Sequence, residues 1–354
     1  MSNIYSLRAN SKRQSNMELL RIVAMFLVLV VHADFAALGH PTHTDAVGDT
    51  AATLWRYLFE GLAIVCVNVF VLLSGWFGIR SSWKGFLKFI FQVAFFSVGL
   101  YILGLCMGWT DCSFAGWLSA FTFTDVPATD CIPLYWFIVS YIGLYLFAPV
   151  LNAFIEKADQ RQLGGTVLAF FVFQTLYGWL LGSEWTIFKD GYSTLSFIGL
   201  YLLAQYIRKY PAKVTQMPAK VDLAAYLLLA VLVAAVGFLG VYFDISGLNT
   251  RLLAYSNPFV ILESVFLLLF FSKLKTQSTA VNFVSASAFA VFLVHLNPNF
   301  YFEAFKRPLR TIYATYSHAT AFWLILAFLL AVYVGAVIVD QIRIILWNII
   351  QRKS

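Results

Sequence analysis

The stretch MELLRIVAMFLVLVVHADFAAL, residues 17–38, decides the fold class of this chain. At about 1.5 Å of rise per residue, a helix of this length crosses the roughly 30 Å hydrocarbon core of a membrane. Basic residues at Arg8, Lys12 and Arg13 precede it, a pattern also typical of a cleaved signal peptide, whose apolar region is shorter. Because many further apolar segments follow, we expect 17–38 to be retained as the first membrane helix.

The whole chain has the composition of a membrane protein. Of its 354 residues, 61% are hydrophobic and 12% are charged, whereas soluble domains are roughly 45–50% apolar and about 25% charged. This composition excludes a soluble enzyme. The net charge of +7 would suggest nucleic acid in a soluble protein, but Lys and Arg collect in the cytoplasmic loops of membrane proteins. We therefore expect membrane lipids, and no nucleic acid, as partners.

Apolar runs of about 20 residues predict an all-α, polytopic membrane helix bundle. In hydrocarbon, backbone N–H and C=O groups must bond within their own segment, so such runs form helices. No internal repeat and no linker to a soluble domain is visible, and we expect a single domain over 1–354. The ten expected spans are 17–38, 54–76, 86–108, 133–155, 164–182, 193–208, 221–243, 255–272, 283–301 and 319–346.

The distribution of Lys and Arg predicts the orientation of this bundle. Loops on the side of the N-terminus hold 17 of these residues and the opposite loops hold five, three of them in the exceptional stretch 306–310. Because positive residues collect on the cytoplasmic side, we expect both the N-terminal segment 1–16 and the tail 347–354 to be cytoplasmic. The loop 109–132 then lies outside, with 39–53.

The cysteines and histidines do not predict a metal site. Cys112 and Cys131 share the outer loop 109–132, and a disulfide there would stabilise the loop by roughly 3 kcal/mol; a disulfide and two free thiols are left as alternatives. No CxxC or HExxH spacing occurs, so we expect no zinc.

Five ionisable residues stand out inside the expected spans: Arg21, His32, Glu60, Glu263 and His295. Each costs roughly 2.5–3.5 kcal/mol at a helix centre, so each needs a partner or a function. Arg21 and His32 are eleven residues apart, close to three helical turns, and are expected on one face. The alternative is that Arg21 anchors the helix at the membrane boundary and His32 is an ordinary core histidine.

Helical rise places four of these residues at a similar depth. Counted from the ends of their spans, His32, Glu60, Glu263 and His295 fall in the outer third of the membrane. Imidazole and carboxylate groups at one level can exchange protons. For Glu60 we favour the alternative of an ion pair with Arg56 one turn earlier, whereas Glu263 has no partner nearby in the sequence.

The inner side of the membrane carries basic residues instead. Arg80, Lys84 and Lys88 follow one another at i, i+4 and i+8, near the expected level of Arg21. Such a stripe fits phosphate oxygens, and simple cytoplasmic anchoring is the alternative. The catalytic interpretation depends on a single continuous interior passage, which we expect to connect this cationic entrance with His32.

The arrangement RxxxxxxxxxxH in MELLRIVAMFLVLVVH (17–32) resembles the signature of integral-membrane acyltransferase family 3. These bacterial proteins acylate, and most often acetylate, extracytoplasmic glycans. The resemblance continues, in order, through nearly the whole chain. Its further segments are NVFVLLSGWFGIR (68–80), WFIVSYIGLYLFAPVLN (136–152), GYSTLSFIGLYLLAQYIRKY (191–210), SNPFVILESVFLLLFF (256–271) and AVFLVHLNP (290–298).

The resemblance implies an acyl-CoA-dependent O-acyltransferase, specifically an O-acetyltransferase using acetyl-CoA, in a bacterial inner membrane. The acceptor would be a glycan or lipid-linked sugar of a surface or exported polysaccharide. The family's motif arginine and histidine correspond to Arg21 and His32. His32 would deprotonate the sugar hydroxyl or transiently accept the acyl group, with Glu263 or His295 orienting it.

Further roles are expected around these residues. Arg21, Arg80, Lys84 and Lys88 would bind the phosphates of the coenzyme, although the family's paired arginines near the third span are only approximated here. Asn68 and Ser74 would donate to the thioester carbonyl, and Trp136 would contact substrate. Leu134 and Tyr135 stand where many relatives have a histidine before the aromatic pair. If that histidine contributes to acceptor binding in those relatives, a different acceptor is expected here.

A protein of another class is the alternative. A proton-coupled transporter or glycan flippase would use His32, Glu263 and His295 as a proton relay without covalent chemistry. Dependence on acyl-CoA distinguishes the two.

Overall fold

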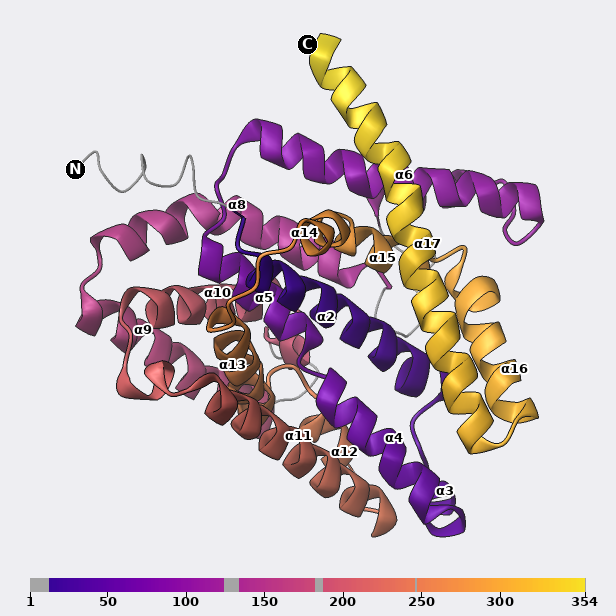
Figure 1. Cartoon of the computed structure of the whole chain (residues 1–354), viewed down its shortest axis with the longest axis horizontal. Coiled ribbons are helices and arrows are strands. Elements are labelled where there is room, and N and C mark those ends of the chain that lie inside the picture. Colours follow the sequence, from indigo (N-terminus) through magenta and orange to yellow (C-terminus); the bar gives the residue numbers. More distant parts are fainter. Residues whose placement is uncertain (1–12, 124–133, 182–186, 246, 354) are drawn as a thin grey trace.

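The computed structural model of the chain is a bundle of helices, with no strand among the residues described (Figure 1). Its first described helix, α2 (Ser15–Val31), lies in the middle of the bundle and contacts α4 (Thr50–Ala63) and α5 (Cys66–Phe77). The apolar segment that decides the fold class is therefore a central helix. The structure describes residues 13–123, 134–181, 187–245 and 247–353.

The other elements pack around α2, and the long helices α6, α11 and α17 lie toward the edges of the view in Figure 1. In chain order they are η1 (His32–Leu38), α3 (His43–Gly48), α6 (Trp83–Met107), α7 (Phe114–Thr122), α8 (Trp136–Lys157), α9 (Gln160–Phe173), η2 (Gln174–Leu180), η3 (Lys189–Gly191), α10 (Thr194–Lys209), η4 (Lys213–Gln216), α11 (Ala219–Tyr242), α12 (Leu248–Leu252), α13 (Pro258–Ser272), α14 (Thr279–Ala286), α15 (Ala288–His295), η5 (Tyr301–Lys306), α16 (Arg307–Thr315) and α17 (His318–Lys353).

Seven of the ten predicted spans are confirmed, within the described part of the chain, as helices long and apolar enough to cross a membrane. The other three are shorter. Helix α10 has 16 residues, α13 has 15 and starts at Pro258, and the ninth predicted span divides at Ser287 into α14 and α15. A proline fits the first turn of a helix because its missing N–H is unpaired there in any case.

The helices differ in how much of their surface faces the interior. In the span Thr50–Phe77, which comprises α4 and α5, 72% of the most apolar window is buried, against 22% in His318–Gln351. Helix α17 is apolar yet largely exposed, as a lipid-facing helix is. It also continues without interruption to Lys353, through most of the segment predicted as a tail. In the outer loop, Cys112 is exposed, and Cys131 lies outside the described residues.

Small residues allow the central helices to approach closely. A Cβ atom on Gly61 of α4 would lie 2.6 Å from the Ala230 carbonyl oxygen of α11. A Cβ atom on Gly75 of α5 would lie 2.7 Å from the Tyr201 carbonyl oxygen of α10. Close backbone contacts at small residues are typical of helix pairs in membranes, where packing rather than water drives association. These two contacts hold α4 and α5, the helices beside α2, in place.

Candidate functional site

His32 lies where the backbone of the first helix changes its hydrogen-bonding pattern. Helix α2 ends at Val31 and the chain continues directly as the π-helix η1. Short π-helical segments are rare and frequently lie at functional sites. Arg310 fixes the end of this segment, because its Nε donates to the Ala37 carbonyl at 2.7 Å.

The predicted ion pair between Glu60 and Arg56 is wrong. Arg56 Nε lies 2.5 Å from Asp34 Oδ1, and its Nη2 donates to the Gly39 carbonyl at 2.5 Å. Glu60 is 3% exposed, and its Oε2 has no hydrogen-bond partner among the described residues. One-turn spacing favours a pair on an isolated helix, but here the tertiary structure brings Asp34 to Arg56 instead.

The structure brings together two of the predicted site residues. His32 Nδ1 lies 3.1 Å from His295 Nε2, although 263 residues separate them in the sequence. The two rings are tilted by 47° with centroids 5.2 Å apart. His295 is buried at the end of α15, and His32 is half-buried. The two histidines thus form one hydrogen-bonded pair.

The hydrogen bonds assign the tautomers of this pair in its neutral form. His295 Nδ1 lies 2.6 Å from the Val291 carbonyl oxygen, which only accepts, so Nδ1 of His295 carries the proton. Nε2 of His295 then accepts, and Nδ1 of His32 must donate to it. The lone pair of neutral His32 is consequently on Nε2. A nitrogen oriented in this way is suited to act as a general base.

A tyrosine and an asparagine fix the end of α15 that carries His295. The Tyr135 hydroxyl donates to the Leu293 carbonyl at 2.6 Å and accepts from Asn297 Nδ2 at 3.1 Å. Tyr135 and Asn297 are buried. The sequence drew attention to Tyr135 only as a departure from the family pattern, and no periodic pattern predicted its contact with α15.

Glu263 is not part of the histidine pair. Its side chain is fully buried in α13, and neither carboxyl oxygen has a hydrogen-bond partner among the described residues. The sequence left Glu263 and His295 as alternative partners of His32. In the structure, the residue of these two that makes a hydrogen bond with His32 is His295. Helical rise predicted a similar depth for the four ionisable residues in the outer third of the membrane. Depth alone does not predict which side of its helix each residue occupies.

A small cavity lies beside the histidine pair. Its volume is about 20 Å³, and roughly 10–15 Å³ of such volume holds one water molecule. Helices α2, α5, α8 and α15 and the turn before α13 enclose it. The lining residues are Met25, Val28, His32, Val67, Phe70, Trp136, Phe137, Tyr255, Phe289 and Phe292.

The three predicted substrate residues lie at different places around this cavity. Trp136 lines it, with its ring centroid 4.4 Å from that of Tyr192. Asn68 is buried and donates one amide hydrogen to the Tyr255 carbonyl at 3.0 Å. Ser74 donates to the carbonyl one turn earlier in α5. Trp136 is therefore the one of the three that borders the cavity directly.

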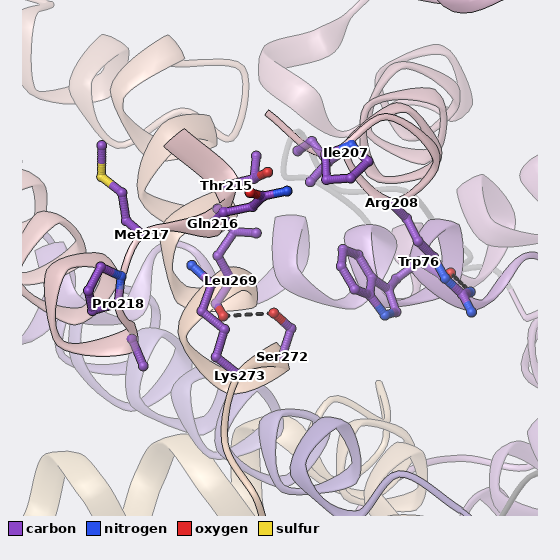
Figure 2. Close-up of a pocket in the computed structure, with 12 residues that line it drawn as sticks. Trp76, Ile207, Arg208, Thr215, Gln216, Met217, Pro218, Leu269, Ser272 and Lys273 are labelled. Carbon is purple, nitrogen blue, oxygen red and sulfur yellow. Dashed lines mark hydrogen bonds between the residues drawn. The ribbon is translucent and has the colours of Figure 1, made fainter. Parts of the chain in front are cut away.

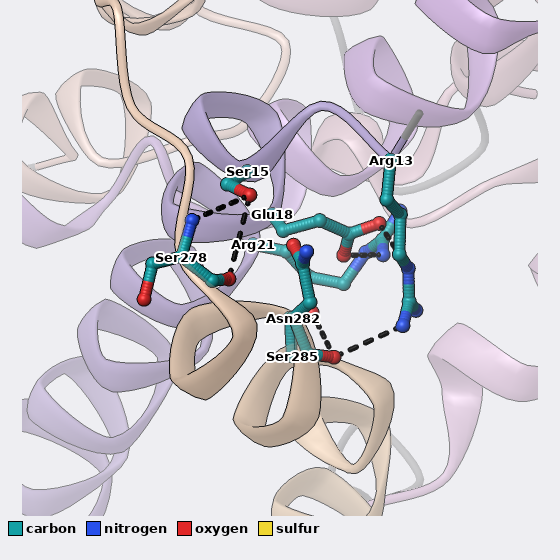
Figure 3. Close-up of polar contacts among 7 residues, drawn as sticks. All are labelled: Arg13, Ser15, Glu18, Arg21, Ser278, Asn282 and Ser285. Atoms are coloured by element: carbon teal, nitrogen blue, oxygen red, sulfur yellow. Dashed lines mark hydrogen bonds and ion pairs between the residues drawn. The ribbon is translucent and has the colours of Figure 1, made fainter. Parts of the chain in front are cut away.

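Arg21 lies at the start of α2, in a network of charged and polar groups (Figure 3). Its guanidinium pairs with Glu18, as the three-residue spacing allows, and Glu18 also binds Arg13 Nε at 3.2 Å. Arg13 in turn donates to the Asn282 carbonyl of α14 at 3.0 Å. The Arg21 side chain is 29% exposed, so part of it stays open to a ligand.

Arg80, Lys84 and Lys88 are all exposed, but they do not form one helical stripe. Helix α6 starts at Trp83 after the N-cap Ser82, so only Lys84 and Lys88 share a helix face and Arg80 lies in the preceding turn. Gly78, with φ of +75°, ends α5 just before this turn and prevents a continuous helix.

The expected open passage from Arg21 to His32 is not found among the described residues, because the cavity beside His32 does not extend to Arg21. Arg21, Met25, Val28 and His32 follow one another on the same face of α2, and only the last three line the cavity. Met25 and Val28 are 2% and 3% exposed. They fill the space between the two motif residues because close-packed apolar side chains maximise dispersion contacts.

A larger groove lies elsewhere in the molecule, among the ends of α5, α10 and α13 and the start of α11 (Figure 2). It has a volume of about 580 Å³, and none of the predicted site residues lines it. Figure 2 shows Trp76 beside Arg208, whose guanidinium lies 5.8 Å from the Trp76 ring. Lys273, also in its lining, pairs with Asp222.

The sequence contained one signal for the aromatic residues of the small cavity. Phe289, Phe292 and His295 recur every three residues in α15, so they follow one face of that helix. This spacing, starting from the predicted His295, identifies Phe289 and Phe292. Tyr255 and Val67 reach the cavity only through the packing of α5 against α13, and no local pattern identifies them.

Comparison with known proteins identifies the family of the chain. A family model described as an acyltransferase domain, acyltransferase 3, matches residues 14–340, nearly the whole chain. No curated protein and no solved structure matched. The family model covers both histidines of the pair, Arg21 and all residues that line the small cavity. The chain therefore belongs to the integral-membrane acyltransferase 3 family.

Proposed function

We propose that this protein is an O-acyltransferase of a bacterial inner membrane. It moves an acyl group, chiefly acetyl, from cytoplasmic acyl-CoA to a hydroxyl of a surface or exported polysaccharide. One observation carries the proposal: a hydrogen-bonded histidine pair, with Nδ1 and Nε2 3.1 Å apart, beside a small, largely apolar cavity. Family membership supplies the reaction class, since the family transfers acyl groups.

His32 acts as the general base of this reaction. Its Nε2 takes the proton of the acceptor hydroxyl while that oxygen attacks the carbonyl carbon of the thioester. The new C–O bond forms, the C–S bond breaks, and the proton passes from His32 to the departing thiolate. General-base assistance contributes about 10²–10⁴ in rate, and alignment of the two substrates contributes most of the remainder.

His295 is a positioning residue that acts through His32. It accepts the Nδ1 proton of His32 and so keeps the lone pair on Nε2. When His32 becomes protonated during the reaction, the same contact stabilises the imidazolium by a charge-assisted hydrogen bond.

The basic residues at the inner side bind the coenzyme. Arg21, Arg80, Lys84 and Lys88 contact its phosphates, supported by the exposure of the last three and the partial exposure of Arg21. Arg21 and His32 are about 16 Å apart along α2 at helical rise, which an extended pantetheine arm spans. The arm reaches His32 when Met25 and its neighbours move aside.

The acceptor reaches His32 at Trp136. This half-buried indole lies against Tyr192 at the border of the cavity, so it offers an aromatic surface next to the base. Aromatic surface beside a base fits a sugar whose hydroxyl faces His32. The proton-relay alternative has weaker support, because Glu263 has no hydrogen-bonded connection to the histidine pair among the described residues.

The proposal is tested with purified protein in liposomes, given radiolabelled acetyl-CoA and a glycan acceptor from the source cell envelope. Labelled sugar ester is the expected product, and His32→Ala is expected to abolish it. His43→Ala, a change of the same kind at an exposed histidine, serves as the control and should leave activity unchanged. Full activity in a folded His32→Ala protein would contradict the mechanism.

A further inference from the structure

The small cavity beside His32 selects its ligand by polarity. Seven of its ten lining residues have apolar side chains: Met25, Val28, Val67, Phe70, Phe137, Phe289 and Phe292. An apolar cavity excludes water and accepts apolar groups. A sugar would leave its hydroxyls unpaired against this lining, at a cost that burial of polar groups always carries. The end of an acyl chain has no such groups.

The cavity also selects by size. Its volume of about 20 Å³ holds a single group the size of a water molecule or a methyl. The methyl group of an acetyl fits this volume, and each further methylene of a longer chain would have to displace lining side chains. Interiors packed at crystal-like density resist such displacement.

Stacked aromatic rings form the floor of this cavity. The Phe289 and Phe292 rings lie 5.7 Å apart and within 8° of parallel. The Phe137 ring lies 5.6 Å from that of Phe292 and 6.5 Å from that of Phe70. Each of these rings thus contacts at least one other ring of the lining.

The floor of the cavity and His295, the hydrogen-bond partner of the base His32, belong to the same helix. Phe289, Phe292 and His295 follow one face of α15, and the Phe292 ring lies 6.3 Å from that of His295. Because His32 and the two phenylalanine rings line one cavity, a thioester whose carbonyl carbon is placed for attack beside His32 can direct its alkyl end toward these rings.

Given the proposed function, we propose that this cavity is the binding site for the alkyl end of the transferred acyl group, and that Phe289 and Phe292 limit that group to two carbons. A pocket that cannot hold one additional methylene binds the longer ligand roughly 10–200-fold more weakly than the shorter one. Helix α15 therefore sets the length of the acyl chain that the donor carries. The residues that recognise the coenzyme phosphates are separate from it.

The test measures equilibrium binding of S-ethyl-, S-butyl- and S-hexyl-CoA thioethers, which cannot transfer their alkyl group, to the protein in nanodiscs. Wild-type protein is expected to bind S-ethyl-CoA at least tenfold more tightly than S-butyl-CoA. Phe292→Ala and Phe289→Leu are expected to remove this preference. Because Phe292 is 6% exposed and its truncation lowers stability, the half-buried Phe289 provides the milder variant.

Two further variants complete the test. Val67→Leu adds a methylene to the cavity wall, and we expect it to weaken S-ethyl-CoA binding at least tenfold. Phe91→Ala, whose ring contacts Trp347 and Phe95 away from the cavity, is the matched control and should preserve the wild-type preference. Equal affinities for all three thioethers in the wild type, or an unchanged preference in both α15 variants, would overturn the proposal. Binding of none of the thioethers would instead contradict the use of acyl-CoA itself.

Discussion

At the scale of single residues, the structure distinguishes the positions of the two histidines, His32 and His295, which the sequence alone could not. His32 borders the cavity, and His295 contacts His32 but is absent from the cavity lining. In the proposed mechanism His295 therefore acts through the tautomer of His32, and this role determines what its substitution is expected to do.

Replacing His295 tests that distinction. His295→Ala removes the acceptor for His32 Nδ1, so kcat is expected to fall at least a hundredfold with the KM for acetyl-CoA unchanged. In His295→Gln the side-chain oxygen can accept the same proton, and we expect recovery to within about tenfold of wild type. Steady-state kinetics in nanodiscs measures both. If glutamine and alanine prove equally inactive, His295 does not act by orienting His32.

Tyr135 is expected to influence activity from one step further away. Its hydroxyl bonds the Leu293 carbonyl at 2.6 Å and accepts from Asn297, so Tyr135→Phe leaves two buried polar groups without a partner. A buried group left unpaired costs about 1–3 kcal/mol, and the thermal midpoint should fall accordingly. We also expect a moderate fall in kcat, because the end of α15 loosens. An unaltered thermal midpoint would show that this hydroxyl does not anchor α15.

At the scale of elements, close contacts between helices depend on single glycines. In Gly75→Ala the new Cβ would lie 2.7 Å from the Tyr201 carbonyl oxygen, so α5 and α10 must separate. We expect a clear loss of thermal stability in detergent, measured by thiol-reactive fluorescence. Gly99→Ala in α6 is the matched control: its Cβ meets nothing within 4 Å, and alanine stabilises a helix interior by roughly 0.5–1 kcal/mol relative to glycine.

Helix α17 carries a buried ion pair that provides a second test at this scale. Arg343 binds Asp340 through two hydrogen bonds of 2.8 and 2.7 Å, and the two side chains are 3% and 0% exposed. Asp340→Asn leaves the arginine charge buried without its counter-ion, which costs about 3–5 kcal/mol. The exposed pair of Glu303 and Arg307 is the control, and Glu303→Gln should cost less than about 1 kcal/mol. Thermal unfolding of the two variants compares them directly, and equal shifts would refute the difference.

At the scale of the whole molecule, the number of crossings determines the side on which each terminus lies. Ten crossings place both termini on one side, and the seven long helices alone would place them on opposite sides. We predict that reporter fusions at both termini report the cytoplasm, because the basic residues favour that side. A C-terminal fusion with periplasmic activity would show an odd number of crossings, and at least one of α10, α13 and α14–α15 would then not span the membrane.

Much of the architecture could be predicted from the sequence, because hydropathy is a local property. Seven predicted spans coincide with long apolar helices, and the shorter helices overlap the other three predicted segments. The ends were predicted less well. The turn after Gly78 removed Arg80 from the expected helical stripe, and α17 continued to Lys353 through the expected tail.

The candidate site was predictable only in part, for the same physical reason. An ionisable residue inside an apolar span is visible in the sequence, so Arg21, His32 and His295 were identified individually. Depth placed Glu60 and Glu263 at the same level, but it could not predict their partners. Arg56 binds Asp34 from another segment, and Glu263 is buried on α13 without a hydrogen-bond partner among the described residues.

The sequence alone determined that this chain is a helical membrane protein of an acyltransferase family, since composition, hydropathy and the order of short motifs are all written along the chain. Only the tertiary structure decided that His32 meets His295, that aromatic rings of α15 close the cavity beside them, and that the path from Arg21 is filled. These contacts join segments up to 263 residues apart, and they depend on how whole helices pack. No local period in a sequence encodes that packing.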